Sequence, residues 1–127
     1  MAHSFSAAPT GPLADGKHVR RKVLVTGAAG NIGSYFAEKS HQKYRLRLMV
    51  RPDEDASDET NKLKKYGDVV TADVSSLDDM KRVCDGIDTV LHLAANPSPS
   101  ATWGSILSAN INGAYNTFVA AKACACR

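Results

Sequence analysis

The chain has 127 residues, which suits one compact domain and is too short for two. Its 43% hydrophobic and 23% charged residues are ordinary for a globular protein, and its formal net charge of +3 is too small to indicate a nucleic-acid partner. No apolar run reaches the roughly 18 residues that a membrane-spanning helix needs. We therefore expect neither a nucleic-acid-binding protein nor a membrane protein.

Residues 1–19 predict a flexible leader, because they are rich in Ser, Ala, Pro and Gly and lack the apolar segment of a secretory signal. A weak organelle transit peptide is the alternative. A single domain over residues 20–127 is expected to follow. The cysteines Cys84, Cys124 and Cys126 have neither disulfide-framework nor metal-ligand spacing, which favours reduced thiols in the cytoplasm and no metal site.

The first element of the domain is an apolar strand over residues 22–26 that stops at a glycine-rich stretch. Gly27, Gly30 and Gly33 follow at three-residue spacing, and a helix is expected over about residues 31–42. A strand, a tight turn and a helix N-terminus in this order are typical of a dinucleotide site, where the helix N-terminus faces the pyrophosphate. The stretch therefore predicts a phosphate-binding loop.

The rest of the chain alternates between predicted strands and helices. In chain order we expect a strand over 45–50, a helix near 57–66, a strand over 68–71, a helix capped by Ser75 or Ser76 and ended before Gly86, a strand over 89–94, a loop over 95–100 and a long last helix. The pattern predicts an α/β fold, a partial Rossmann-type doubly wound parallel sheet with helices on both faces. Right-handed crossovers give the strand order 3-2-1-4.

Helical periodicity predicts which side chains of the helices are buried. In the first helix Ile32 and Phe36 are expected to face the sheet, and the helix near 57–66 is expected to be loosely held by Leu63 and Tyr66. Cys84 is expected in the core. The third predicted helix would bury Leu77, Met80, Cys84 and Ile87, and the last would bury Leu107, Ile111, Ala114, Phe118 and Ala121.

Four short motifs occur in order along the chain. They are Thr26-Gly27-x-x-Gly30-x-x-Gly33, Asp73-Val74, His92-Leu93-Ala94-Ala95, and Asn110-Ile111-Asn112-Gly113 with Asn116. Over about residues 22–125 the chain resembles the extended short-chain dehydrogenase/reductase family, the NAD-dependent epimerases and dehydratases. The stretch 92–116 is particularly similar to uronate dehydrogenases and related sugar-modifying members.

This resemblance implies the NAD(P)-binding portion of an oxidoreductase or epimerase that acts by hydride transfer on a sugar-like or nucleotide-sugar substrate. The alternative is a non-catalytic NAD(P) sensor or regulatory module. The expected cofactor-binding residues are Gly27, Gly30, Asn31, Ile32, Gly33, Arg51, Asp73, Val74, Leu93, Ala94 and Ala95. The resemblance gives Asn110 a role supporting the catalytic group, and the loop 97–100 would border the substrate.

Three residues of the four motifs have a simpler interpretation beside the functional one. Asp73 would contact adenine, or it would only shape the turn before the next helix. Asn110 would support catalysis or be a helix-packing amide, and the two are weighed equally. His92 lies among apolar residues, which favours a hydrogen-bonded core histidine over a catalytic base.

The choice between NAD and NADP depends on the end of the second strand. Arg51 suits a 2′-phosphate and leans slightly toward NADP, whereas Asp53, Glu54 and Asp55 would repel the added charge. Asp53 is also a candidate to reach the ribose. The sequence therefore predicts NAD or NADP without deciding between them.

The family's catalytic Ser or Thr and Tyr-x-x-x-Lys follow a fifth strand, which this sequence does not reach. Tyr35 and Lys39 match the second pattern literally, but they lie on the expected phosphate-binding helix and we interpret them as a surface pair. An unpaired fourth strand would leave the chain marginally stable and prone to self-association through the exposed sheet edge.

Overall fold

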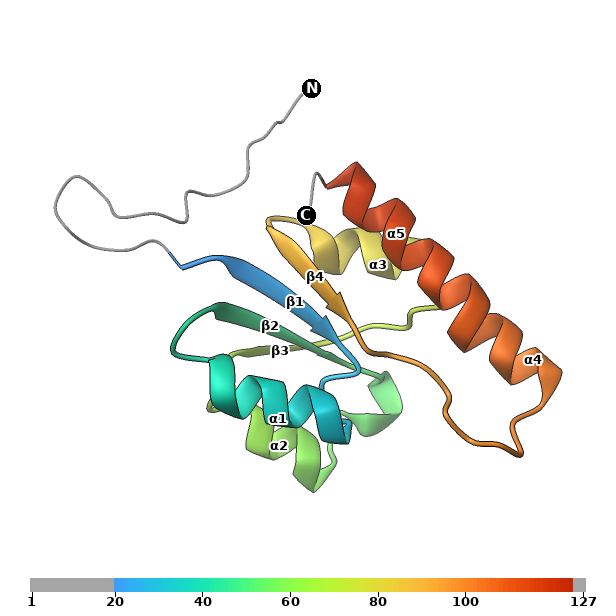
Figure 1. Ribbon diagram of the computed structural model, residues 1–127, viewed down its shortest axis with the longest axis horizontal. Coiled ribbons are helices and arrows are strands. Elements are labelled where there is room, and N and C mark those ends of the chain that lie inside the picture. The colour runs from blue at the N-terminus through green and yellow to red at the C-terminus, as the bar shows by residue number, and fades with distance from the viewer. Residues whose placement is uncertain (1–19, 125–127) are drawn as a thin grey trace, which may run out of the picture.

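The computed structural model describes residues 20–124 (Figure 1). Four parallel strands form one sheet in the order β3-β2-β1-β4. The strands are β1 (Lys22–Thr26), β2 (Arg45–Val50), β3 (Asp68–Thr71) and β4 (Thr89–His92). The predicted α/β sheet and its strand order are confirmed. The expected leader over residues 1–19 and Cys126 lie outside the described residues.

Helices cover both faces of this sheet. They are α1 (Asn31–Ser40), the 3₁₀ turn η1 (Pro52–Glu54), α2 (Asp58–Leu63), α3 (Leu77–Cys84), α4 (Trp103–Ser105), the π-helical segment η2 (Ile106–Asn112) and α5 (Gly113–Ala123). Helices α1 and α2 lie on one face, and α3 and α5 lie on the other (Figure 1). Among residues 20–124, none of the helices combines the length and apolarity needed to span a membrane.

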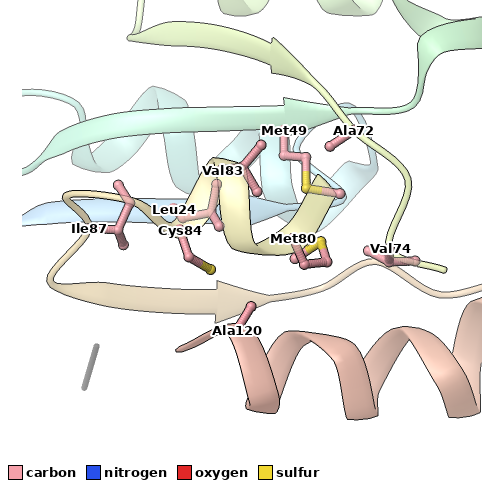
Figure 2. Close-up of a cluster of buried hydrophobic side chains, with 9 residues drawn as sticks. All are labelled: Leu24, Met49, Ala72, Val74, Met80, Val83, Cys84, Ile87 and Ala120. Atoms are coloured by element: carbon pink, nitrogen blue, oxygen red, sulfur yellow. The ribbon is translucent and has the colours of Figure 1, made fainter. Parts of the chain in front are cut away.

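Alternating strand side chains divide the core into two clusters. On the α1–α2 side, Val23 and Val25 of β1 pack with Leu48 of β2. On the opposite side, Leu24 of β1 and Met49 of β2 pack with the buried side chains of α3 and α5 (Figure 2). Each strand of the central pair is therefore buried on both faces, as expected for a parallel sheet between two helical layers.

Helix α3 follows the prediction closely. Ser76, the second of the two proposed caps, accepts a hydrogen bond from the Asp79 backbone N–H through its side chain, at 3.2 Å. Met80 and Cys84 are completely buried in the cluster of Figure 2. The prediction that Cys84 is a core residue is confirmed.

The predicted buried stripe of the last helix is wrong. Phe118 is 76% exposed and Ile111 is 46% exposed. The buried positions of α5 are instead Gly113, Asn116, Thr117 and Ala120. A Cβ added at Gly113 would lie only 2.8 Å from the Val74 Cγ2. The helix therefore packs too closely on its neighbours for large side chains, which point outward instead.

Two smaller predictions also differ from the structure. Ile32 is 70% exposed, because Gly33 and Ala37 occupy the buried face of α1, while Phe36 packs partly against the core as expected. Helix α2 is anchored by Thr60 as well as Leu63, and both are buried. The expectation that α2 is loosely held by apolar contacts alone therefore missed a buried polar anchor.

Candidate functional site

A cleft of about 660 Å³ opens at the carboxyl ends of the strands. All the residues predicted to bind a cofactor line it: Gly27, Gly30, Asn31, Ile32, Gly33, Arg51, Asp73, Val74, Leu93, Ala94 and Ala95. Sequence reasoning missed five further lining residues, Met49, Val50, Asn96, Ser105 and Ala109. Glu54, which it considered only as a charge that repels a 2′-phosphate, also lines the cleft. This position, outside the carboxyl ends of parallel strands, is where ligands bind in open α/β sheets.

Two positions of the glycine loop at the floor of the cleft, Gly27 and Gly33, have room only for glycine. Gly27 has a φ of +69°, and a Cβ there would lie 2.9 Å from the Ala94 backbone nitrogen. A Cβ on Gly33 would overlap the Gly27 carbonyl oxygen and lie 2.8 Å from the Ala28 Cα. The helix N-terminus is therefore held directly against the end of β1.

The N-terminus of α1 is chemically suited to an anion. Within the described part of the chain, no side chain caps this helix and its first turn contains no acidic residue. The N-cap is Gly30, and Asn31, Ile32 and Gly33 form the first turn along the cleft wall. Backbone N–H groups and the positive end of the helix dipole favour phosphate at such a terminus.

The end of β2 places an ion-paired arginine on the cleft wall. The Arg51 Nε lies 3.3 Å from an Asp53 carboxylate oxygen, and its Nη2 lies 3.5 Å from a Glu54 carboxylate oxygen. Glu54 also accepts a hydrogen bond from the Arg51 backbone N–H at 3.0 Å. Glu54 lines the cleft together with Arg51, whereas Asp53 does not. Glu54 is therefore the carboxylate that would compete with an anionic ligand for the Arg51 guanidinium.

Asp73 shapes the turn before α3 and also lines the cleft. Its Oδ1 accepts hydrogen bonds from the Ser75 backbone N–H at 2.9 Å and from the Ser75 hydroxyl at 2.7 Å. This turn leads into α3, as the simpler interpretation expected. Asp73 also lines the cleft beside Val74, where its other carboxylate oxygen has no hydrogen-bond partner among the described residues.

A buried hydroxyl joins β1 to the chain that follows β4. The Thr26 Oγ1 accepts hydrogen bonds from the backbone N–H groups of Leu93 at 2.9 Å and Ala94 at 3.1 Å. Its own proton is thus left for the His92 Nδ1, which lies 2.8 Å away. The Thr117 hydroxyl, which also lies near the His92 Nδ1, donates its proton to the Gly113 carbonyl at 2.7 Å. Thr26 is therefore the donor to the His92 Nδ1. His92 is hydrogen-bonded as expected, but it is half-buried and does not belong to the fully buried core.

Stability is expected to depend on pH through His92. Burial lowers the pKa of His92 below its ordinary value of 6.5, so folding favours the neutral imidazole. The stabilisation is complete above about pH 6.5 and is lost as pH falls through the lower pKa of the folded state. Urea unfolding from pH 8 to pH 5 measures this loss. His92→Asn keeps an acceptor for Thr26 but cannot titrate, so a pH profile as steep as that of the original protein would contradict the assignment.

Asn110 lies in the π-helical segment and holds the loop after β4. Its Oδ1 accepts a hydrogen bond from the Asn96 backbone N–H at 2.7 Å, and its Nδ2 donates to the Asn96 carbonyl at 3.1 Å. The Asn96 Nδ2 donates in turn to the Ser105 hydroxyl at 2.6 Å. Asn110 is not itself a cleft-lining residue, whereas Asn96 and Ser105 are.

A second amide on the same helix was missed as a site residue. The buried Asn116 Nδ2 donates to the Val74 carbonyl at 3.0 Å. Val74 lines the cleft, as Asn96 does. Polar side chains of η2 and α5 thus hold two separate segments of the cleft wall. The signal in the sequence was an asparagine of the fourth motif with Gly113 and Ala120 on the same helix face.

The Tyr35 and Lys39 pair lies outside the cleft. The Lys39 Nζ sits 5.6 Å from the centre of the Tyr35 ring, and it also lies 4.0 Å from a Glu38 carboxylate oxygen. Tyr35 is exposed and lines a separate surface depression between α1 and α2. The structure therefore places this pair as a surface contact of α1, away from the strand ends.

The parallel sheet, the glycine loop and the helix N-terminus together define a Rossmann-type domain with a nucleotide-sized cleft. The model of the NAD dependent epimerase/dehydratase family matches residues 23–127. The chain belongs to this family.

The relatives of the chain include dehydrogenases that are named for sugars. The chain is 37% identical over 102 residues to an L-arabinose 1-dehydrogenase (NAD(P)(+)) of Haloferax volcanii, covering 80% of this chain and 36% of that protein. It is 35% identical to an NAD-dependent glucose-6-phosphate dehydrogenase of the same organism, covering 78% and 37%. Uronate dehydrogenase from Agrobacterium tumefaciens, a mutant complexed with NAD, is 28% identical with a TM-score of 0.65, covering 83% and 37%. The chain therefore spans little more than a third of these relatives.

Proposed function

We propose that residues 20–127 form the NAD(P)-binding domain of an oxidoreductase or epimerase that acts on a sugar-like or nucleotide-sugar substrate. The observation that carries the proposal is the glycine cradle, where backbone at Gly27 and Gly33 excludes any Cβ beside an uncapped helix N-terminus. Family membership and the sugar dehydrogenases among the relatives support the substrate class.

The cleft fits a dinucleotide by size and by its lining. Its volume lies within the range of roughly 300–1,000 Å³ for small-molecule sites. In the proposal the α1 N-terminus holds the pyrophosphate, Asp73 and Val74 hold the adenine, and Leu93 to Ala95 lie along the inner face. The cofactor would supply hydride transfer. Asn110 acts as a positioning residue, through the loop at Asn96 that would border the substrate.

Titration of the whole chain with NADH and NADPH tests the proposal, with nucleotide fluorescence or calorimetry as the readout. Saturable binding of at least one of them is expected. The absence of binding by either at millimolar concentration would refute the cofactor site. Gly30→Ala sharpens the test, because an added Cβ would be 3.4 Å from the Gly27 carbonyl oxygen and the fold tolerates it. We expect this variant to keep its melting temperature and lose binding at least tenfold.

The Arg51–Glu54 pair is expected to set the balance between NAD and NADP. Glu54→Gln removes the carboxylate that competes for the Arg51 guanidinium, so affinity for 2′,5′-ADP should rise about two- to fivefold relative to 5′-ADP. Arg51→Ala should remove the preference. Asp55→Asn is the control, since it loses the same charge, and among the described residues Arg51 forms its ion pairs with Asp53 and Glu54 instead. An equal effect of Asp55→Asn and Glu54→Gln would show a general charge effect.

A sensor that binds NAD(P) without turnover is the second candidate for the chain by itself. It is favoured by the placement of Tyr35 and Lys39, the only Tyr-x-x-x-Lys of the sequence, on the outside of α1. Incubation with NAD⁺, NADP⁺ and uronic acids or pentoses distinguishes the candidates. Binding without reduced-nucleotide formation supports the sensor for this chain, and turnover that survives Tyr35→Phe requires another catalytic group.

A further inference from the structure

Two cysteines lie at the C-terminal ends of two helices on the same face of the sheet. Cys84 is the last residue of α3, and Cys124 directly follows the last residue of α5. Cys84 is completely buried, whereas Cys124 is half-buried at the edge of the same hydrophobic cluster. Both are thiols in the structure. They are the two cysteines of residues 20–124.

The packing of the two helices places the Cys124 sulfur beside α3. The Cys124 Sγ lies 3.8 Å from the Lys81 carbonyl oxygen. Lys81 and Cys84 are three residues apart on α3 and are therefore neighbours on its surface. The Cys124 sulfur thus lies within one helical turn of the Cys84 side chain.

The buried face of α5 leads directly to Cys124. Gly113, Thr117 and Ala120 are buried positions of this helix, and Cys124 follows Ala120 after four residues, on the same face. Ala120 and Cys84 belong to one buried cluster (Figure 2), against which Cys124 packs. A disulfide needs Cα atoms about 4.4–6.8 Å apart. The small side chains on this face of α5 permit such a close approach to α3.

Neither a metal site nor simple burial accounts for both sulfurs. Among residues 20–124, no three His, Cys, Asp or Glu side chains gather as metal ligands would, and structural zinc takes about four. Burial in an apolar cluster explains Cys84 by itself. It does not require a second sulfur at the partly exposed edge of that cluster.

We propose that Cys84 and Cys124 are a redox-sensitive thiol pair that closes to a disulfide between α3 and α5. The oxidant is a small-molecule disulfide such as glutathione disulfide. The Cys124 thiolate attacks one sulfur of the oxidant, forming a mixed disulfide and releasing one thiol. The Cys84 thiolate then attacks the Cys124 sulfur, breaks the mixed disulfide and releases the second thiol. The two cysteines lose two electrons and two protons, and the oxidant takes up both.

Exposure sets the order of these two steps. Cys124 is accessible to solvent at the end of α5, whereas Cys84 is 0% exposed and cannot meet a bulky oxidant directly. Fraying of the last turn of α5 lets the two sulfurs meet. In a reducing compartment the pair remains as thiols, and oxidising conditions close it, as in redox-sensing proteins of the cytosol.

The disulfide would fix the position of a helix that supports the cleft. Asn116 of α5 donates to the Val74 carbonyl on the cleft wall, and the new bond would hold the end of the same helix against α3. It would also close a loop of about 40 residues and so restrict the unfolded chain. The melting temperature should therefore rise by at least about 5 °C on oxidation.

Incubation of the whole chain in glutathione buffers of rising oxidised fraction tests the proposal. Intact mass should show the loss of two hydrogen atoms, and peptide mapping without reductant should join the peptides that contain Cys84 and Cys124. Dithiothreitol should reverse both changes and the gain in melting temperature. Cys126→Ser is the matched control, which removes the remaining cysteine and should leave the bond unchanged.

Two variants in the Cys126→Ser background test the order of the steps. Cys84→Ser should stop at one glutathione on Cys124, because no second thiol can displace it. Cys124→Ser should take up at least tenfold less glutathione while it is folded, because Cys84 is buried. Circular dichroism verifies folding, and Cys124→Ser, which changes only a half-buried side chain, keeps the test valid if Cys84→Ser unfolds.

Several results would overturn the proposal. One is a chain that keeps all its thiols in the most oxidising buffer. Another is a bond between Cys124 and Cys126, or a bond between two chains, in place of the bond from Cys84 to Cys124. An oxidised protein that melts below the reduced one also overturns it, because the two helices would then have to move apart to form the bond.

Discussion

Gly33→Ala should reduce both the stability of the domain and its affinity for NAD(P). The new Cβ would overlap the Gly27 carbonyl oxygen and lie 2.8 Å from the Ala28 Cα, and both neighbours are backbone. Backbone cannot rotate away as a flexible side chain can, so α1 must move off the end of β1. We expect the free energy of unfolding to fall by about 1–3 kcal/mol, as for overpacking in a core. Nucleotide affinity should fall more than tenfold, because the N–H groups of α1 move with the helix.

Gly104→Ala is the matched control for this substitution. It makes the same chemical change in α4, where an added Cβ meets nothing within 4 Å. Chemical denaturation and nucleotide titration of both variants separate a packing effect from loss of glycine in general. If Gly33→Ala unfolds at the same denaturant concentration as the original protein, α1 and β1 can accommodate the added Cβ. The claim that only glycine fits at this position would then be wrong. Gly30→Ala, which should affect binding alone, completes the comparison.

The fold and the cleft were predictable because local sequence signals and global packing agree. A strand that stops at Gly27 and a helix that starts after Gly30 fix the first crossover. Parallel strands then bring their carboxyl ends to one edge, so residues far apart in sequence, such as Arg51 and Ala95, must line the same cleft. No side-chain packing detail was needed for this step.

The outward face of the last helix was not predictable from apolar periodicity. The stripe through Leu107 and Phe118 has the spacing of a buried face, yet it is exposed. The face of the helix that is buried carries the small residues Gly113 and Ala120 instead. Periodicity locates an apolar stripe on a helix but does not say whether that stripe faces the core or the surface of the domain. The distance between α5 and its neighbours decides the matter, and only the folded structure contains that distance.

The side-chain partners of Arg51 and His92 also could not be predicted from the sequence. Three carboxylates follow Arg51, and the structure shows that Glu54 alone of these shares the cleft wall with it. His92 has its acceptor nitrogen directed to Thr26, which lies 66 residues earlier. Contacts between distant residues depend on strand register, which pairs Thr26 with His92 across β1 and β4. A single sequence does not state that register.

Thr26→Val should be the most destabilising of the single substitutions considered. The side chain is completely buried, and valine fills nearly the same volume without the hydroxyl. The Ala94 N–H loses its acceptor, the His92 Nδ1 loses its donor, and Leu93 keeps only its 3.3 Å bond to the Thr26 carbonyl. Unsatisfied buried groups cost about 1–3 kcal/mol each, so a loss of about 2–4 kcal/mol is expected.

Two further variants assign that loss to the hydroxyl. Thr26→Ser keeps the hydrogen bonds and loses one methyl group, at a cost of about 1 kcal/mol. Thr60→Val removes an equally buried hydroxyl that contacts Ser57 rather than the strand junction, and should cost less. An equal loss in Thr60→Val would attribute the effect to burial of any hydroxyl.

The pH dependence of the Thr26→Val effect separates the His92 contact from the two backbone contacts. Above pH 6.5 the neutral imidazole accepts the Thr26 proton, and valine removes that bond. Once His92 is protonated, Nδ1 carries its own proton and the original protein has already lost the bond. The difference in unfolding free energy between the two proteins should therefore shrink between pH 8 and pH 5. A constant difference would mean that Thr26 acts only through Leu93 and Ala94, and that His92 accepts its hydrogen bond from elsewhere.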